Sequence, residues 1–136
     1  DADYDPDQRR GELLMLRLDL KREPVWLELG HGVRLQVRPC TTALMMAARV
    51  AAAREAVLEA DDRDGVGGAG ERTAILIKTL GKLAGLAWEG VGDAKGKPAP
   101  LTPEGIEALL DLWPIAEAFE RLYLAPALLL DQEKNA

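Results

Sequence analysis

The sequence contains few of the residue types from which catalytic and metal sites are built. Serine is absent from its 136 residues, and Cys40 and His31 are the single examples of their types. One cysteine cannot form an internal disulfide, and neither residue has a nearby partner that would complete a metal site or a nucleophile–base pair. We therefore predict a protein without enzymatic activity, metal or cofactor. We expect Cys40 to be a small buried side chain and His31 to be a turn residue that tolerates positive φ.

An excess of basic charge and long hydrophobic runs are also missing. The net charge is −6, whereas phosphate binding requires a basic surface. We therefore expect no nucleic-acid partner, and we expect Lys78, Lys82, Lys95 and Lys97 to be solvated. No apolar run reaches the roughly 18 residues of a membrane span, and the acidic first residues do not resemble a signal peptide. These absences predict a cytoplasmic protein without a membrane partner.

The length predicts a single domain. Two segments are expected to lie outside its compact part. Residues 1–12 are polar and acidic, which predicts a disordered tail or an added extension, and residues 13–136 are expected to form a single α+β domain. Residues 61–70 are rich in Gly and Asp, which predicts a flexible linker. This linker matches a dinucleotide-binding glycine pattern, but it follows a predicted helix instead of a strand. It also matches part of a calcium loop, but that loop's first acid is missing.

Three short segments near the N-terminus have the two-residue alternation of strands. They are 14–20, 25–29 and 33–37, and the last two are joined by Gly30-His31-Gly32, which is typical of a tight turn. The pattern predicts a β-hairpin over 25–38. With 14–20 as a possible partner, it predicts a small antiparallel sheet of two or three strands.

The rest of the chain predicts about four helices, which makes the fold α+β. Their expected ranges are 42–60, 71–87, 103–112 and a last helix opened by Pro114. Thr41 or Thr42 is suited to cap the first helix and Thr102 the third. Gly81 and Gly85 predict the close approach of another backbone, and Pro126 should kink or end the last helix.

The predicted helix over 42–60 is rich in alanine and has one face of larger apolar residues. Met46, Val50, Ala53 and Val57 lie on this face at helical spacing. The adjacent Met45 and Met46 are typical either of an adaptable binding surface or of core packing. We expect core packing.

Most aromatic residues lie in the C-terminal third, where we place the candidate binding surface for a client or a second copy. Aromatic side chains dominate interface energetics, and the candidates are Trp88, Trp113, Phe119, Tyr123 and Leu124. Core packing is the alternative, and we favour it for Trp113 and Phe119. Because Tyr123 and Leu124 point about 100° apart on a helix, we expect one of them to be partly exposed.

Residues 86–135 resemble the phage tail assembly chaperone family of long-tailed phages, prophages and gene-transfer-agent-like elements. The matching residues are Trp88-Glu89-Gly90-Val91, Asp93, Gly96, Pro98, Leu101-Thr102-Pro103-Glu104, Leu109-Leu110, Pro114, Phe119, Tyr123 and Glu133-Lys134-Asn135. Pro126 and the glycine-rich segment at 61–70 depart from the family pattern.

The resemblance implies a cytoplasmic protein that holds the tape-measure protein in solution until tail tube subunits polymerise around it. Such proteins often self-associate, so a homo-oligomer is expected. The mechanism implied is holding without covalent chemistry, in which apolar grooves accept an amphipathic client helix. The acidic net charge fits a partly basic client.

Three alternatives remain open from the sequence. One is a structural tail component such as a terminator or connector, which would be present in mature particles. The others are an unrelated binding module and a small enzyme. Mass spectrometry of purified particles separates a virion component from a chaperone.

Overall fold

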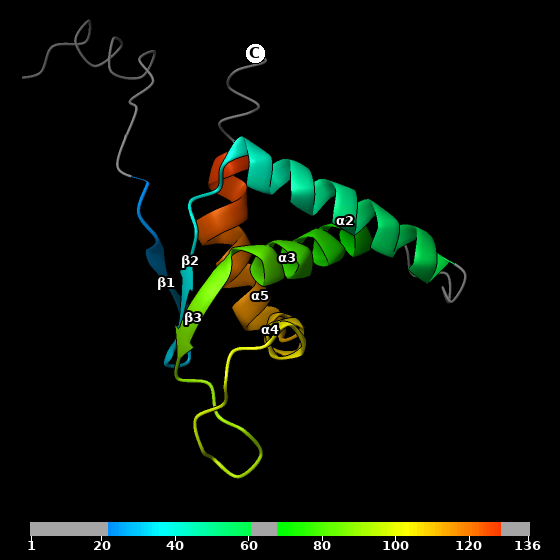
Figure 1. Cartoon of the computed structure of the whole chain (residues 1–136). Helices are drawn as coiled ribbons and strands as arrows, with labels where there is room; N and C mark the ends of the chain where they lie inside the picture. Colours follow the sequence, from blue (N-terminus) through cyan, green and yellow to red (C-terminus); the bar gives the residue numbers. More distant parts are fainter. Residues whose placement is uncertain (1–21, 61–67, 129–136) are drawn as a thin grey trace, which may run out of the picture.

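The computed structural model describes residues 22–60 and 68–128, and it confirms the predicted α+β class (Figure 1). One antiparallel sheet has the order β1 (Val25–Gly30), β2 (Val33–Val37), β3 (Gly85–Glu89). The helices are α2 (Thr42–Ala60), α3 (Ala69–Ala84), α4 (Pro103–Leu110) and α5 (Trp113–Phe119), and α5 continues into a wider helical turn, η1 (Glu120–Leu124). The predictions for 1–12, for a strand at 14–20 and for most of the linker at 61–70 lie outside the described residues.

The predicted hairpin forms with the expected turn. Leu27 of β1 stands opposite Leu35 of β2, and both are buried on the inner face. On the outer face, the Arg34 Nε donates to Glu28 Oε1 at 2.7 Å. His31 adopts φ 55° in the turn and is exposed, so the predicted role of His31 as a turn residue is confirmed.

The prediction of a helix over 71–87 is wrong at its C-terminal end, because α3 ends at Ala84. Gly85 is extended (φ −65°, ψ 128°), and β3 then pairs with β2, with Trp88 opposite Leu35. The apolar residues of 85–89 continue the helical spacing, but their backbone also pairs with the edge of β2 that β1 leaves open. Tertiary pairing overrides the local pattern here. The third strand of the described sheet therefore comes from the middle of the chain.

The helices divide into two groups around α3 (Figure 1). On one side α3 runs beside α2, and on the other it packs against α4, while α5 lies against β1. The core fills the space between the inner face of the sheet and these helices. Its most completely buried side chains are Phe119, Leu35, Leu80, Ile106, Leu124 and Val37.

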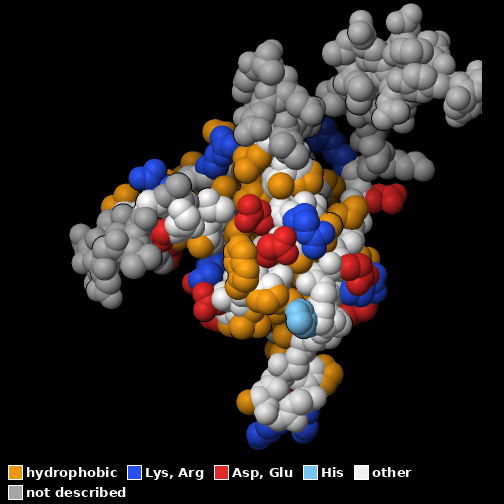
Figure 2. Space-filling model, turned by 180° about the vertical axis from the view of Figure 1, so that it is seen from behind, with side chains coloured by type: hydrophobic (Ala, Val, Ile, Leu, Met, Phe, Trp, Pro, Cys, Tyr) orange, Lys and Arg blue, Asp and Glu red, His pale blue; other side chains and the backbone are white. Residues whose placement is uncertain are grey.

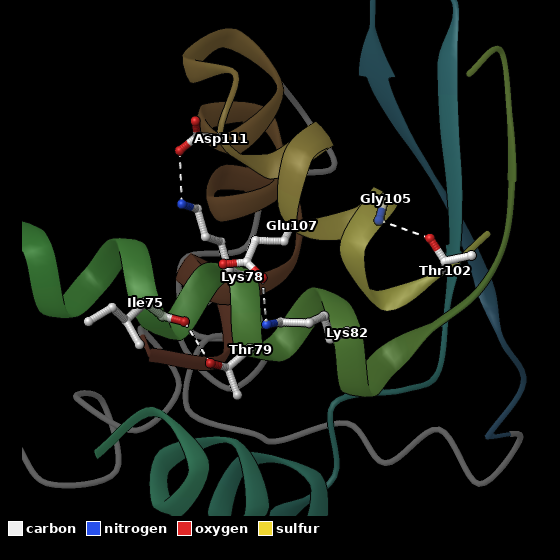
Figure 3. Close-up of polar contacts among 8 residues, drawn as sticks. All are labelled: Ile75, Lys78, Thr79, Lys82, Thr102, Gly105, Glu107 and Asp111. Carbon is white, nitrogen blue, oxygen red and sulfur yellow. Dashed lines mark hydrogen bonds and ion pairs between the residues drawn. The ribbon is translucent and has the colours of Figure 1, made fainter. Parts of the chain in front are cut away.

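Gly81 sets the distance between α3 and α4. A Cβ at this position would collide with the Leu110 side chain and lie 3.1 Å from Ile106 Cγ2. The prediction that another backbone approaches Gly81 is therefore wrong, because its close neighbours are side chains of α4. Two ion pairs join the helices at their exposed edge: Lys78 Nζ to Asp111 Oδ1 at 2.8 Å, and Lys82 Nζ to Glu107 Oε2 at 3.1 Å (Figure 3).

The helix boundaries carry the predicted caps. Thr102 Oγ1 accepts a hydrogen bond from the Gly105 N–H at 3.0 Å (Figure 3), and Thr41 Oγ1 accepts from the Leu44 N–H at 3.2 Å. Pro126 does not end the last helix, because helical backbone continues to Leu128, and this part of the prediction is wrong. In the turn before Pro126, the Ala125 N–H bonds to the Glu120 carbonyl, one residue further back than in an α-helix. Widening the turn relieves the clash that a proline ring makes with the preceding turn.

Gly90 and Gly96 allow conformational strain to be separated from steric collision. Both have φ near +80° (82° and 79°), but a Cβ at Gly90 would collide with the Gly32 carbonyl, whereas a Cβ at Gly96 meets nothing within 4 Å. We expect Gly96→Ala to lower the free energy of unfolding by about 1–2 kcal/mol, the cost of a left-handed alanine. Gly90→Ala should cost at least about 2 kcal/mol more, because backbone cannot move aside as a side chain can. Urea denaturation measures both, and equal losses would contradict this account.

Candidate functional site

The helix α2 is attached to the rest of the protein mainly through small side chains. Leu44 and Met45, in its first turn, are half-buried against the core. Beyond that turn, the buried residues of α2 whose side chains are described are Ala48 (0% exposed) and Ala52 (9%). Their small size allows α2 to approach α3 closely, but it buries little apolar area.

The larger side chains of α2 point into solvent. The exposed fractions are 55% for Met46, 53% for Val50, 71% for Val57 and 70% for Leu58. Together with the exposed Ala53, these residues form what we call the α2 apolar face. The prediction that the methionine pair packs in the core is therefore wrong for Met46, although Met45 does contact the core. Adjacent residues of a helix point about 100° apart, so Met45 faces the core while Met46 faces solvent.

Arginines border the central row of the α2 apolar face on both sides, and Leu58 lies beyond Arg54. At 3.6 residues per turn, Arg49 and Arg54 lie about 70° to either side of the row Met46–Val50–Ala53–Val57. Both arginines are exposed, and neither forms an ion pair within the described parts of the chain. In Figure 2 the upper left edge of the molecule, formed by α2, carries hydrophobic and basic side chains.

A shallow hollow lies in the second half of the α2 apolar face. It has a volume of about 470 Å³ and is lined, among the described residues, by Ala53, Arg54, Val57 and Leu58. The exposed lining is almost wholly apolar, so Arg54 contributes mainly the aliphatic part of its side chain. Such a hollow suits an apolar side chain of a partner.

Sequence reasoning missed this surface because it expected the methionine pair of α2 to pack in the core. A signal was available: the helix has alanines along the opposite edge, and alanine allows close helix packing. In an alanine-rich helix, the face with small residues can be the one that packs. Periodicity alone therefore does not distinguish the buried face from the exposed one.

Trp113 is the predicted site residue that lies at the surface. It is 69% exposed, so the expectation of core packing is wrong for this residue. Trp113 opens α5 immediately before Pro114, two residues after α4 ends. Its ring stands beside a groove of about 360 Å³ between α3 and α5, with Ile77 and Leu110 among the lining residues.

Phe119, Tyr123 and Leu124 are buried at 0%, 7% and 1% exposure. The expectation that Tyr123 or Leu124 is partly exposed is therefore wrong. These two residues lie in the widened turn η1, and the structure around the last helix covers both directions in which they point. The Phe119 and Tyr123 rings lie 5.2 Å apart, so the structure brings these two candidates together inside the core and away from solvent.

Trp88 connects the sheet to the loop before α4. Its Nε1–H donates to the Ala99 carbonyl at 2.8 Å, and its ring lies close to Gly105 at the start of α4. Trp113, by contrast, follows the end of α4. The five candidates therefore do not form one continuous surface.

The hydroxyl of Tyr123 holds the last helix to the chain between β2 and α2. It donates a hydrogen bond to the Arg38 carbonyl at 2.6 Å and lies near the half-buried Cys40. Burial raises the pKa of the Tyr123 phenol above its usual value, and burial also raises the pKa of the Cys40 thiol. A raised pKa keeps the thiol protonated, which suits the packing role predicted for Cys40.

Comparison with protein-family models, with curated proteins and with solved structures found no match to this chain. Within the described ranges, no group of three or more His, Cys, Asp and Glu side chains is arranged to hold a metal ion. No helix in the same ranges combines the length and the apolarity that a membrane crossing requires.

The buried Tyr123 hydroxyl predicts a loss of stability at alkaline pH. Its pKa is raised in the folded state, so its contribution is complete below pH 10 and is lost as the pH rises above that value. Tyr123→Phe keeps the ring and removes one hydrogen bond, which should cost about 1 kcal/mol at pH 8. Above pH 10 the variant should lose less stability than the parent. Parallel alkaline losses in thermal melts at pH 8 and pH 11 would contradict this assignment.

Proposed function

We propose that this protein is a non-enzymatic tail assembly chaperone. It would hold an amphipathic helix of a tape-measure protein on the α2 apolar face, in the host cytoplasm, until tail tube subunits assemble. Two observations of different kinds support the proposal. One is the resemblance of residues 86–135 to tail assembly chaperones, and the other is the exposure of the large apolar side chains of α2.

The exposed α2 apolar face carries the proposal. Isolated apolar side chains are normal on protein surfaces, but a row along one helix is typical of a binding surface. Met46, Val50 and Val57 follow the spacing with which one helix packs along another. A client helix with a matching apolar stripe would find a complementary surface there.

The size of this face fits transient holding. At 1.5 Å per residue, the 19 residues of α2 extend about 28 Å. A partner helix along this length would bury on the order of 600–800 Å² from both molecules, below the 1,200–2,000 Å² typical of stable complexes. At about 25 cal/mol per Å², the gross gain is of the same order as the cost of association. Binding would therefore be weak and reversible, as release to tube subunits requires.

Self-association belongs to the same proposal but needs additional surface. Two copies pairing through α2 alone would bury only this limited area. Trp113 and Leu112 are exposed at the opposite side of α3 and offer a second apolar region. We propose that oligomers, where they form, use this second region and leave the α2 apolar face to the client.

The double variant Val50→Gln/Val57→Gln tests the binding role of α2. Both side chains are more than half exposed, so the melting temperature should change by less than about 3 °C. Because the apolar stripe is interrupted, co-expressed tape-measure protein should remain in the insoluble fraction. Pelleting assays measure the soluble fraction of the tape-measure protein. The parent chaperone gives its upper limit, and expression without chaperone gives its lower limit.

Val25→Gln is the matched control, because Val25 is a similarly exposed valine outside α2. This variant should keep the client soluble. Full client solubility with the α2 double variant, together with loss in the Val25 variant, would place the client site elsewhere.

A further inference from the structure

We infer that the α2 apolar face selects client helices whose apolar stripe is bordered by acidic residues. This inference rests on the proposed function and adds the charge of the partner. It also departs from the basic client that the overall charge suggests, because the local charge at the α2 face has the opposite sign to the net charge of −6.

Positive charge on α2 lies at the borders of the apolar row. Arg49 and Arg54 lie on the two borders of the apolar row, so a helix lying along it would pass both guanidinium groups. Neither arginine forms an ion pair with a described residue. Arginine forks match carboxylates in a two-point geometry. Acidic residues on both sides of the client stripe would therefore be recognised.

The described acidic charge on α2 points away from the apolar row. Among the α2 side chains that the structure describes, Glu55 is the acid, and it lines a groove shared with Lys78 and Lys82 of α3. It therefore lies on the edge toward α3, away from the apolar row. A client helix with basic borders would place its positive charges next to Arg49 and Arg54, with no described acid beside the apolar row to offset them. Repulsion between like charges would disfavour that partner.

The same arrangement disfavours a second copy as the occupant. In an α2–α2 pair, both partners would bring Arg49 and Arg54 to the contact, and neither would bring a described acid. A helix with acidic borders supplies the missing charge. The hollow beside Arg54 would take an apolar side chain of this helix, with a carboxylate one turn away on the guanidinium.

Two synthetic helical peptides with the same apolar heptad stripe test the inference. One carries Glu and the other Lys at all border positions, and binding to the full chain is measured by fluorescence anisotropy. We expect the Glu peptide to bind about fivefold to tenfold more tightly, since exposed ion pairs contribute modestly. Its advantage should shrink in high salt.

Arg49→Glu/Arg54→Glu should invert this preference. Lys95→Glu/Lys97→Glu is the matched control, because it changes the net charge equally in the loop that projects away from α2 (Figure 1). This control should retain the preference for the Glu peptide. If the loop variant also inverts it, long-range charge is responsible and the inference is overturned.

The remaining outcomes separate the inference from the proposed function. Equal binding of both peptides, unchanged by arginine reversal but lost in Val50→Gln/Val57→Gln, would overturn the charge selection and leave the helix-binding role intact. Failure of both peptides to bind would overturn both proposals. A concentration-dependent dimer in sedimentation velocity, dissociated by Val50→Gln/Val57→Gln, would assign the face to a second copy and also overturn the inference.

Discussion

Close packing on both sides of α3 is the constraint on which the rest of the structure depends. On one side, Gly81 leaves room for Leu110, so α4 approaches α3 and brings the last helix onto the sheet. On the other side, Ala48 and Ala52 allow α2 to lie close to α3. Small residues therefore set both distances, but with different consequences. The α4 side encloses large side chains, whereas the α2 side leaves them in solvent.

This asymmetry separates stability from binding. Phe119, Tyr123 and Leu124 fill the space between the sheet and the helices, so changes there should act mainly on folding. The α2 apolar face contributes little to the core and is available to a partner. In the proposed role, its arginine borders would add selectivity without burying charge in the protein. The proposed chaperone thus combines a well-packed core with one helix whose larger apolar side chains stay exposed for a partner.

Particular residues explain how far the sequence predicted this fold. The hairpin turn, the Thr102 cap and the break before Pro114 are local signals, and the structure has all three. The strand β3 was missed because its residues fit a helical pattern. They form a strand because they pair with the edge of β2, a contact distant in sequence. The orientation of α2 was also missed, since its outward and inward faces are both apolar. Burial of Tyr123 and Leu124 together depends on elements that pack around the last helix in both directions, which no local pattern specifies.

The central claim is that α2 is held by a thin alanine edge and presents its larger apolar side chains to a partner. Hydrogen exchange of backbone amides in the free protein tests this most directly, because it reports the local free energy of opening. The account predicts that the second half of α2 exchanges much faster than the core-facing half of α3 around Leu80. Addition of a bound client helix should then slow exchange in α2. Equally slow exchange in α2 and α3 of the free protein would contradict the account.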